Sequence, residues 1–420
     1  MNRFVLTLVA ALAVPTWAAD AGLKTFLDAA DKQNVDGRLT LEAREKAEAD
    51  YRVAVSALFP SLTAQGVWTN NQYPAVIQLP GSPTKLTITP ENQLNGVLRL
   101  DLPLIDTTRW MRLLAAGVGR DGAKEREAVM RDLVRKQVVG AYYGYAASLQ
   151  LLQSAKKSVS VAETQLKLTE VRYGAGAVTE LEVLRARAEV QRNRQTVADS
   201  ASLVATTRRN LRTLSGLEPP ADVAIPAPDL HGETAFEELE KNVDGLPAVK
   251  AADADKVAAD DLRTAATLAF VPVVGAQFTE NFTNATGFTG KVTSYNLGVA
   301  LTWRLDGPTI TNLDSQDHVQ NSAALGVERA RLVARDQIHS DWQSFTAALL
   351  KVEAADAQVQ AASKAQQVAR DRYNAGAATQ VDVIQADRDL FQAEVSQISA
   401  RTSLVSARLS LHISAGLPVE

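Results

Sequence analysis

The chain of 420 residues has no cysteine, which excludes disulfide bonds, cysteine metal sites and an acylated N-terminal cysteine anchor. Aromatic residues make up only 5% of it. Beyond the N-terminus, no stretch reaches the roughly 18 apolar residues that a transmembrane helix needs, so a chain of this kind would cross a membrane as a β-barrel. The net charge of −4, without a basic block, argues against a nucleic-acid partner.

The N-terminus has the pattern of an export signal. Residues 1–3 carry a positive charge, residues 4–14 are apolar, and Thr16 and Ala18 place small side chains at the two positions that a signal peptidase reads. The apolar run is too short for a permanent membrane span, so we predict a cleaved signal peptide at residues 1–18. An uncleaved anchor or a buried N-terminal helix is the alternative.

An internal repeat is the main feature of the sequence. Residues 172–184 return as residues 372–384, with seven of the thirteen positions identical at an offset of 200. Near the start of each half, Asn-Val-Asp-Gly occurs at residues 34–37 and again at 242–245. Such self-similarity indicates that one structural unit has been duplicated.

The segment between the two halves is rich in proline, with Pro219, Pro220, Pro226 and Pro228. Prolines at this density predict an extended linker. The predicted domain organisation is a signal peptide at 1–18, a first repeat at 19–217, a linker at 218–232 and a second repeat at 233–420.

Each half begins with a proline-free, alanine-rich segment that predicts a helix, at residues 39–58 and 251–268. A pair of segments with alternating apolar residues follows in each half, and these predict strands. The predicted strands are residues 61–69, 94–104, 273–282 and 295–305. Polar loops rich in proline or glycine separate the members of each pair, at residues 70–92 and 284–293.

The strands leave two interpretations open. About ten residues of alternation is the length of a tilted strand that crosses a bilayer, but a soluble sandwich with one buried face shows the same alternation. Four strands cannot close a barrel, and an open edge is not tolerated in lipid. A membrane location therefore requires several copies of the chain to build one barrel.

A long segment without internal breaks follows each strand pair. Residues 106–172 and 306–372 have the same span, and Pro308 near one start is their only proline. Alanine, glutamine and charged residues fill these segments, as is typical of long helices. A continuous helix of this span is about 100 Å long and must pack against neighbours along its length, as in a coiled coil.

The repeated motif predicts the turn that ends each long helix. Tyr-Gly-Ala-Gly at 173–176 and Tyr-Asn-Ala-Gly at 373–376 place glycine or asparagine where a left-handed residue terminates a helix. Thr179 and Thr379 are then expected to cap the returning helices. Glu182 and Asp382, three residues further on, have the spacing of a capping box.

The pattern Arg-Tyr-x-x-Gly-x-x-Thr-x-x-Asp/Glu-Val-Leu/Ile, present twice, resembles the TolC-type outer-membrane efflux protein family over nearly the whole chain beyond residue 18. The resemblance implies a mainly α fold with a transmembrane β-barrel part. Three chains would form a 12-stranded β-barrel in outer-membrane lipid, continued into the periplasm by an α-helical barrel. It also implies a passive channel, without cofactors, that docks to a periplasmic adaptor protein and an inner-membrane transporter.

The resemblance assigns roles to residues of both turns, which would form the periplasmic tip. The residues expected to dock the adaptor are Arg172, Tyr173, Gly176, Thr179, Arg372, Tyr373, Gly376 and Thr379. Glu182 and Asp382 match acidic positions at the narrow entrance, where like charges favour cations. Two positions depart from the family pattern, because Ala378 stands where some members have an arginine and Gln385 stands where some have a second acidic residue.

Patterns of catalysis or metal binding do not emerge from the sequence. Residues 117–122 match G-x-G-x-x-G, but no strand directly precedes them and no acidic residue stands about twenty positions later. The four histidines form no ligand spacing. We therefore expect a non-enzymatic protein without cofactor or metal. The alternative to the channel is a structural periplasmic coiled-coil protein, and an enzyme built on long helices is a third possibility.

Overall fold

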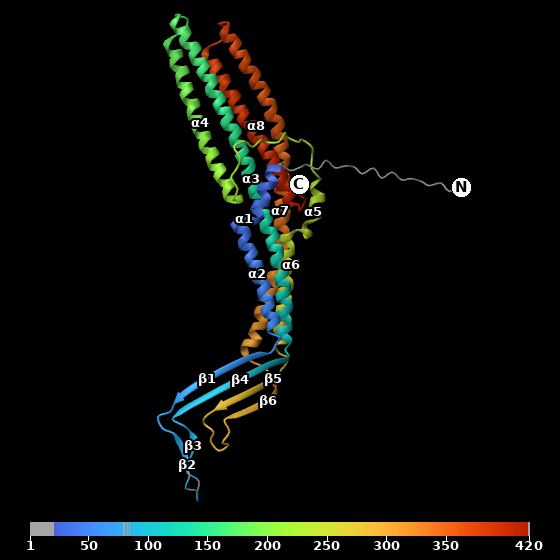
Figure 1. Ribbon diagram of the computed structural model, residues 1–420. Helices are drawn as coiled ribbons and strands as arrows, with labels where there is room; N and C mark the ends of the chain where they lie inside the picture. The colour runs from blue at the N-terminus through green and yellow to red at the C-terminus, as the bar shows by residue number, and fades with distance from the viewer. Residues whose placement is uncertain (1–20, 79, 82, 84, 419–420) are drawn as a thin grey trace, which may run out of the picture. The chain divides into compact units, whose positions relative to one another are not determined.

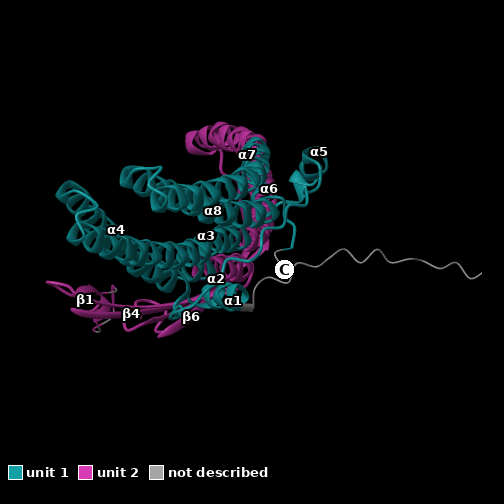
Figure 2. Ribbon diagram, turned by 90° about the horizontal axis from the view of Figure 1, so that it is seen from above, with its two compact units in different colours: residues 1–41, 126–249, 331–420 teal, residues 42–125, 250–330 magenta. Residues whose placement is uncertain are grey.

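The computed structural model describes residues 21–78, 80, 81, 83 and 85–418. The predicted signal peptide lies outside the described residues. The chain divides into two compact units (Figure 2), one made of residues up to 41 with 126–249 and 331–420, the other of residues 42–125 and 250–330. We call them unit 1 and unit 2. Each unit takes segments from both halves of the sequence repeat.

Unit 2 contains an antiparallel four-stranded sheet (Figure 1) in the order β1-β4-β5-β6. The strands are β1 (Ser61–Asn70), β4 (Asn92–Ile105), β5 (Val273–Thr283) and β6 (Thr293–Thr302). All four confirm strands predicted from the alternating pattern. The central pairing joins the two halves of the chain, because β4 of the first repeat pairs with β5 of the second from Asn95↔Thr283 onward.

The register of the sheet separates apolar from polar side chains. Residues directly opposite one another share a face. One row across the four strands is Leu62, Leu100, Phe278 and Leu297, and the adjacent row is Thr63, Arg99, Thr279 and Asn296. None of the residues in these four strands is buried, so neither face of the sheet is covered by another layer of the described chain.

The loop expected between β1 and β4 contains a second, small sheet that the sequence analysis missed. Strands β2 (Ala75–Gln78) and β3 (Lys85–Thr89) pair antiparallel within it. The prolines that suggested an irregular loop stand outside both strands, where a missing N–H removes no ladder hydrogen bond. These prolines are Pro74, Pro80, Pro83 and Pro90.

Two helices of about twenty residues precede the strand pairs, as predicted. They are α2 (Val35–Ser56) and α6 (Pro247–Leu268), and each begins four residues before the predicted start. In unit 2, α2 packs on the long helix α3 (Thr107–Gly174). A Cβ atom added to Gly117 would lie 3.6 Å from the ring of Tyr51. The Arg120 guanidinium lies 4.7 Å from the centre of the same ring. The G-x-G-x-x-G stretch therefore lies within a continuous helix, and Gly117 is the position at which α2 approaches it.

The two long helices are confirmed. Helices α3 and α7 (Gly307–Asn374) each have 68 residues. Equivalent aspartates cap their starts: the Asp106 carboxylate accepts the N–H of Arg109 and the Asp306 carboxylate accepts that of Thr309, both at 3.0 Å. Among the described residues, no helix has an apolar stretch long enough to cross a membrane.

Each long helix turns back into a returning helix, so that unit 1 contains two helical hairpins (Figure 1). The returning helices are α4 (Glu180–Ser215) and α8 (Gln380–Ser414). The sequence analysis missed α1 (Ala21–Gln33), although Leu23, Phe26, Leu27 and Ala30 have the i, i+3, i+4, i+7 spacing of a helix face. These four side chains are buried in a core with the Val134–Ala146 part of α3, including Tyr142 and Tyr145.

The segment between the halves has no helix or strand from residue 218 to residue 235. It leads to the short helices α5 (Phe236–Glu240) and η1 (Val243–Gly245). It is held at several points along unit 1. The Tyr145 hydroxyl donates to the carbonyl of Pro220 at 2.7 Å, and Val223 is buried in the core.

A buried arginine of α8 holds the other end of this segment. Arg408 is only 7% exposed, and its guanidinium pairs with Asp229 at 2.9 Å and Glu233 at 2.8 Å and donates to the carbonyl of His231 at 2.6 Å. Burial disfavours ionisation of Asp229, but hydrogen bonds from His231 and the charge of Arg408 outweigh it and lower the pKa of Asp229. The pairing therefore stabilises the fold above the ordinary pKa of 3.8 and is lost as the pH falls through the lowered value.

Arg408→Met should destabilise unit 1 by about 2–3 kcal/mol, because the half-buried carboxylates of Asp229 and Glu233 would lose the guanidinium that both contact. Arg194→Met is the control. Arg194 forms an exposed ion pair with Glu163 at 2.8 Å, which contributes about 0–1 kcal/mol. Thermal and denaturant unfolding should separate the two variants clearly. Equal losses would show that Arg408 is no more important than a surface pair.

Candidate functional site

The repeated motifs form two turns with the same backbone geometry. In the first, the N–H of Gly176 donates to the carbonyl of Tyr173 and the N–H of Ala177 to that of Arg172, both at 2.9 Å. The second turn repeats these bonds from Gly376 to Tyr373 and from Ala377 to Arg372 at 3.1 and 2.8 Å. This is the Schellman pattern, and it requires a left-handed residue, which Gly176 (φ +71°) and Gly376 (φ +76°) supply. Residues 174 and 374 remain the last residues of their helices.

The predicted capping box is present at the second turn. The Thr379 hydroxyl accepts the N–H of Asp382 at 3.3 Å, and the Asp382 carboxylate accepts the backbone N–H of Thr379 at 2.7 Å and its hydroxyl at 2.8 Å. These hydrogen bonds from Thr379, with a smaller contribution from Arg372, lower the pKa of Asp382. Asp382 is therefore a charged, well-ordered carboxylate at the start of α8.

The capping box predicted at the first turn is wrong. Thr179 has the extended backbone of a cap residue, but its side chain accepts no cap hydrogen bond. Residue type does not account for the difference, because glutamate is the usual third residue of a capping box and Glu182 stands at that position. The two turns therefore share a backbone but differ in side-chain order.

The two hairpins contact each other beside the turns. The guanidinium of Arg172 lies 4.8 Å from the ring centre of Tyr373 and donates to the side-chain oxygen of Asn374 at 3.1 Å. Tyr373 is consequently only 8% exposed, while its repeat equivalent Tyr173 is 47% exposed. Equivalent residues of the motif thus have different roles, since Arg172 and Tyr373 connect the hairpins whereas Tyr173 and Arg372 are exposed.

Further polar contacts connect the hairpins along their length. Gln380, at the start of α8, donates to Thr169 of α3 at 3.3 Å, and both side chains are buried. Arg388 of α8 pairs with Glu189 of α4 at 2.5 Å, and this hydrogen bond raises the pKa of Arg388. The sequence analysis missed these residues. Their polar character is visible in the sequence, but which of them meet depends on how the two hairpins align.

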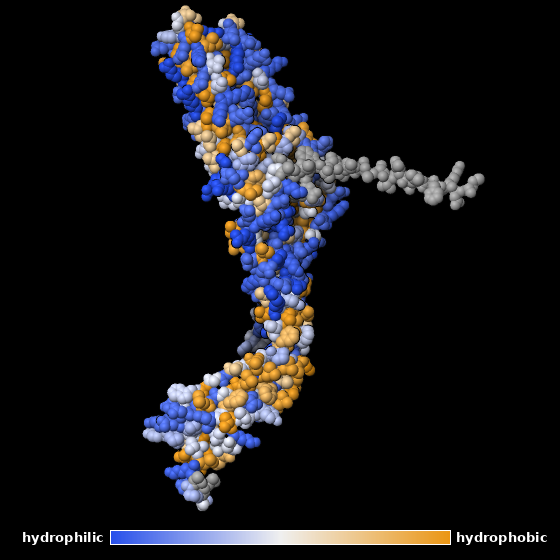
Figure 3. Space-filling model, viewed as in Figure 1, coloured by the Kyte–Doolittle hydropathy of each residue, from blue (hydrophilic) through white to orange (hydrophobic). Residues whose placement is uncertain are grey.

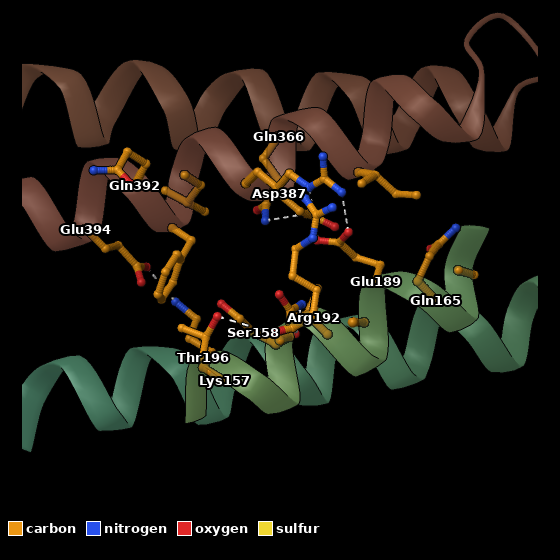
Figure 4. A pocket seen from close by; sticks show the side chains of 18 residues that line it. Lys157, Ser158, Gln165, Glu189, Arg192, Thr196, Gln366, Asp387, Gln392 and Glu394 are labelled. Carbon is orange, nitrogen blue, oxygen red and sulfur yellow. Dashed lines mark hydrogen bonds and ion pairs between the residues drawn. The ribbon is translucent and has the colours of Figure 1, made fainter. Parts of the chain in front are cut away.

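A cavity of about 200 Å³ lies between the hairpins (Figure 4). Its lining combines both charges, with basic Lys157, Arg192 and Arg388 and acidic Glu189, Asp387 and Glu394. Lys157 and Glu394 pair across it at 3.0 Å. Because these charges largely compensate one another, the cavity favours neither a cation nor an anion, and it is large enough for a few water molecules.

The residues predicted to line an entrance are not brought together within the described chain. Gln385 is exposed and donates to Asp389 at 2.8 Å, within its own helix. Asp382 interacts with Thr379 and Arg372 of its own hairpin. Glu182 lies at the start of the other returning helix, α4. If these side chains face one another, they must do so across different copies of the chain.

Among the described residues, no group of three or more histidine or acidic side chains could hold a metal ion. The turns instead present backbone, small side chains and one aromatic ring.

Comparison with known proteins gives a family match over both halves. The model of the family described as outer membrane efflux protein matches residues 39–217 and 243–417. The probable efflux pump outer membrane protein TtgC of Pseudomonas putida is 26% identical over 230 residues, which are 54% of this chain and 46% of TtgC. Nodulation protein T of Rhizobium leguminosarum bv. trifolii is 26% identical over 403 residues, 90% of this chain and 82% of that protein. The chain thus aligns with about half the length of TtgC.

Among solved structures, the fold is similar to that of CusC, which was crystallised to follow transmembrane channel formation. The TM-score is 0.82 over 95% of this chain and 93% of CusC, at 18% sequence identity. At this identity the likeness concerns the fold. It covers the strands as well as the hairpins, since nearly the whole chain is aligned.

Tyr373→Phe should change the free energy of unfolding by less than about 0.5 kcal/mol. The Tyr373 hydroxyl is buried without a hydrogen-bond partner among the described residues, and the substitution keeps the ring that Arg172 contacts. Tyr145→Phe is the matched control and should cost about 1 kcal/mol, since it removes the hydrogen bond to Pro220. Thermal unfolding of both variants provides the test. A loss in Tyr373→Phe as large as that in Tyr145→Phe would contradict this account of the turn.

Proposed function

Because the chain belongs to the outer membrane efflux protein family, we propose that it is the channel subunit of a tripartite efflux pump or type I secretion system. In this role it is a passive export duct in the outer membrane that extends into the periplasm. Each sequence repeat, 19–217 and 233–420, contributes one strand pair and one helical hairpin. The signal peptide proposed at residues 1–18 directs the chain to export.

The observation that carries the proposal is the uncovered four-stranded sheet of unit 2. Its outer strands β1 and β6 each have one unpaired edge within the described chain, and neither face is buried. Unpaired edges are tolerated in lipid only when they are closed into a barrel. Three copies placed edge to edge give twelve strands, so we propose a homotrimer with a closed barrel in outer-membrane lipid.

The hairpin turns are the proposed docking surface for a periplasmic adaptor, which connects the channel to an inner-membrane transporter. Both turns expose backbone around a left-handed glycine. A Cβ atom added to Gly176 or Gly376 would have no other atom within 4 Å. TtgC is a probable efflux pump outer membrane protein, and this similarity supports partners of this kind. The docking residues are then Tyr173, Gly176, Thr179, Arg372, Gly376 and Thr379, with Arg172 and Tyr373 supporting them from the contact between hairpins.

The alternative, a structural periplasmic coiled-coil protein without channel activity, accounts for the hairpins but not for the sheet. A soluble protein would have to cover the apolar row that includes Phe278 and Leu297, and the described chain leaves that face uncovered. The channel accounts for both parts of the chain.

The purified protein should conduct ions in planar lipid bilayers. A variant that combines Gly176→Trp with Gly376→Trp should conduct equally well but abolish export in the native cell, because the bulky rings obstruct docking. A variant that combines Gly176→Asn with Gly376→Asn is the control, since asparagine tolerates the left-handed backbone with a small side chain. Absence of conductance would refute the channel, and unchanged export in the tryptophan variant would refute the docking surface.

Asp382→Asn should reduce the preference of the channel for cations severalfold, because we propose that Glu182 and Asp382 form a ring of like charge at the entrance. The lowered pKa of Asp382 keeps its carboxylate charged to below pH 3.8, so the preference of the original protein should persist to that pH. Reversal potentials in a KCl gradient measure this preference for cations. Asp199→Asn is the control, because it removes an exposed charge within α4 and should leave the cation preference almost unchanged. Equal effects of the two substitutions would show that Asp382 has no special place in the pore.

A further inference from the structure

The cavity between the two hairpins of unit 1 has no part in the proposed function. Side chains from α3, α4, α7 and α8 line it, and Figure 4 shows those of the first hairpin facing those of the second. Its volume is about 200 Å³. In another protein, an engineered apolar cavity of about 150 Å³ binds benzene. The cavity between the hairpins is therefore large enough for a molecule with a single aromatic ring.

Part of the cavity wall is apolar. Two alanines in it are buried, and four larger apolar side chains are half-buried. A ligand that removes the remaining surface of these side chains from water gains free energy. They are Val161 and Ala162 of α3, Ala186 of α4, and Ile384, Leu390 and Phe391 of α8. On the outer face of the hairpins seen in Figure 3, hydrophobic residues lie in small groups among hydrophilic ones. An apolar ring thus finds contacts on several sides in the cavity that this outer face does not offer.

The acidic side chains of the lining each have a basic partner. Arg192 is the remaining charged residue of the lining, and it is exposed, so water and salt screen its charge. A charged ligand would have to compete with the existing ion pairs, whereas an uncharged ligand leaves them intact. The pairs are Glu189 with Arg388, Glu394 with Lys157 and Asp387 with Arg370.

One polar group in the wall lacks a partner. Gln165 of α3 lines the cavity, and its Nε2 atom is buried without a hydrogen-bond partner among the described residues. A buried amide group that stays unpaired costs free energy, which a ligand with a suitable polar atom restores. A phenolic hydroxyl both accepts and donates a hydrogen bond, so it satisfies the side-chain amide in either of its two orientations.

We propose that this cavity binds a small uncharged phenol, with the ring against Ile384 and Phe391 and the hydroxyl hydrogen-bonded to Gln165. Such a molecule contacts both hairpins, because Gln165 belongs to the first and Phe391 to the second. Water molecules also form hydrogen bonds with an amide, but they gain nothing from the apolar part of the wall. Binding at this place depends only on the cavity and is independent of the proposed function.

The probe is 3-fluorophenol, which is uncharged at pH 7 and whose ¹⁹F resonance reports binding. With the full-length protein, the resonance should shift saturably with a dissociation constant of about 0.1–1 mM, a value within reach of a ligand of this size. Ala186→Leu fills part of the cavity and should abolish the saturable shift. Ala205→Leu is the matched control, because residue 205 is exposed on α4 and does not line the cavity, and it should leave the affinity unchanged.

Two analogues test the hydroxyl and the charge. Fluorobenzene lacks the hydroxyl and should bind about three- to tenfold more weakly than 3-fluorophenol. Gln165→Leu should remove most of this difference by weakening 3-fluorophenol alone, a comparison that does not depend on the fold of the Ala186→Leu variant. The charged analogue 3-fluorobenzoate should bind at least about tenfold more weakly than 3-fluorophenol.

Three outcomes would overturn the proposal. The first is a shift that does not saturate below about 10 mM, or that is the same in the original protein and in Ala186→Leu. The second is tighter binding of 3-fluorobenzoate than of 3-fluorophenol, which would mean that the cavity selects an anion. The third is an equal loss of affinity for 3-fluorophenol and fluorobenzene in Gln165→Leu, which would show that Gln165 does not bind the hydroxyl.

Discussion

The antiparallel pairing of β4 with β5 is the interaction on which the rest of unit 2 depends. It joins strands of different sequence repeats from Asn95↔Thr283 to Ile105↔Val274, so that two hairpins become one sheet. The pairing also sets the faces of the sheet, because a shift of one residue would move every leucine of β4 to the polar side. The uncovered apolar face, on which the proposed barrel depends, follows from this register.

Duplication gave the chain two copies of one turn, and the copies have diverged in what surrounds them. Both have the same Schellman hydrogen bonds and a left-handed glycine, because backbone geometry depends on only a few residues that the repeat retains. Their side chains differ because the two hairpins lie beside each other. Arg172 covers Tyr373, whereas Arg372 and Tyr173 are exposed, so that the second turn supports the contact between hairpins and the first presents an aromatic ring.

Unit 1 is held together by both apolar and charged contacts. The core around Tyr145 fixes α1 to α3, and Arg408 fixes the segment between the halves to α8 through Asp229 and Glu233. Polar contacts such as Glu189 with Arg388 join the two hairpins, and a cavity with compensated charges separates them in one place. Polar contacts of this kind align two helices without the large side chains of an apolar core, which suits a protein with few aromatic residues.

The sequence by itself determined the four main strands, the two long helices that follow them and the position of both turns. These features depend on local patterns, such as alternation, the absence of proline and a glycine after a helix, and such patterns are complete within a few residues. It also contained the signal for α1 in the spacing of Leu23, Phe26, Leu27 and Ala30, which was overlooked beside the export signal. The small β2–β3 sheet was missed because its prolines lie next to the strands rather than in them.

Only the tertiary structure decided which equivalent residues of the repeat have equivalent roles. Sequence alone treats Tyr173 and Tyr373 alike, and it predicts a capping box at both Thr179 and Thr379. In the structure one tyrosine is buried, because Arg172 of the other hairpin covers it, and only the capping box at Thr379 is formed. Contacts such as Arg172 with Tyr373 or Arg408 with Asp229 join residues about two hundred positions apart. Their partners are set by the alignment of whole helices, which no local pattern records.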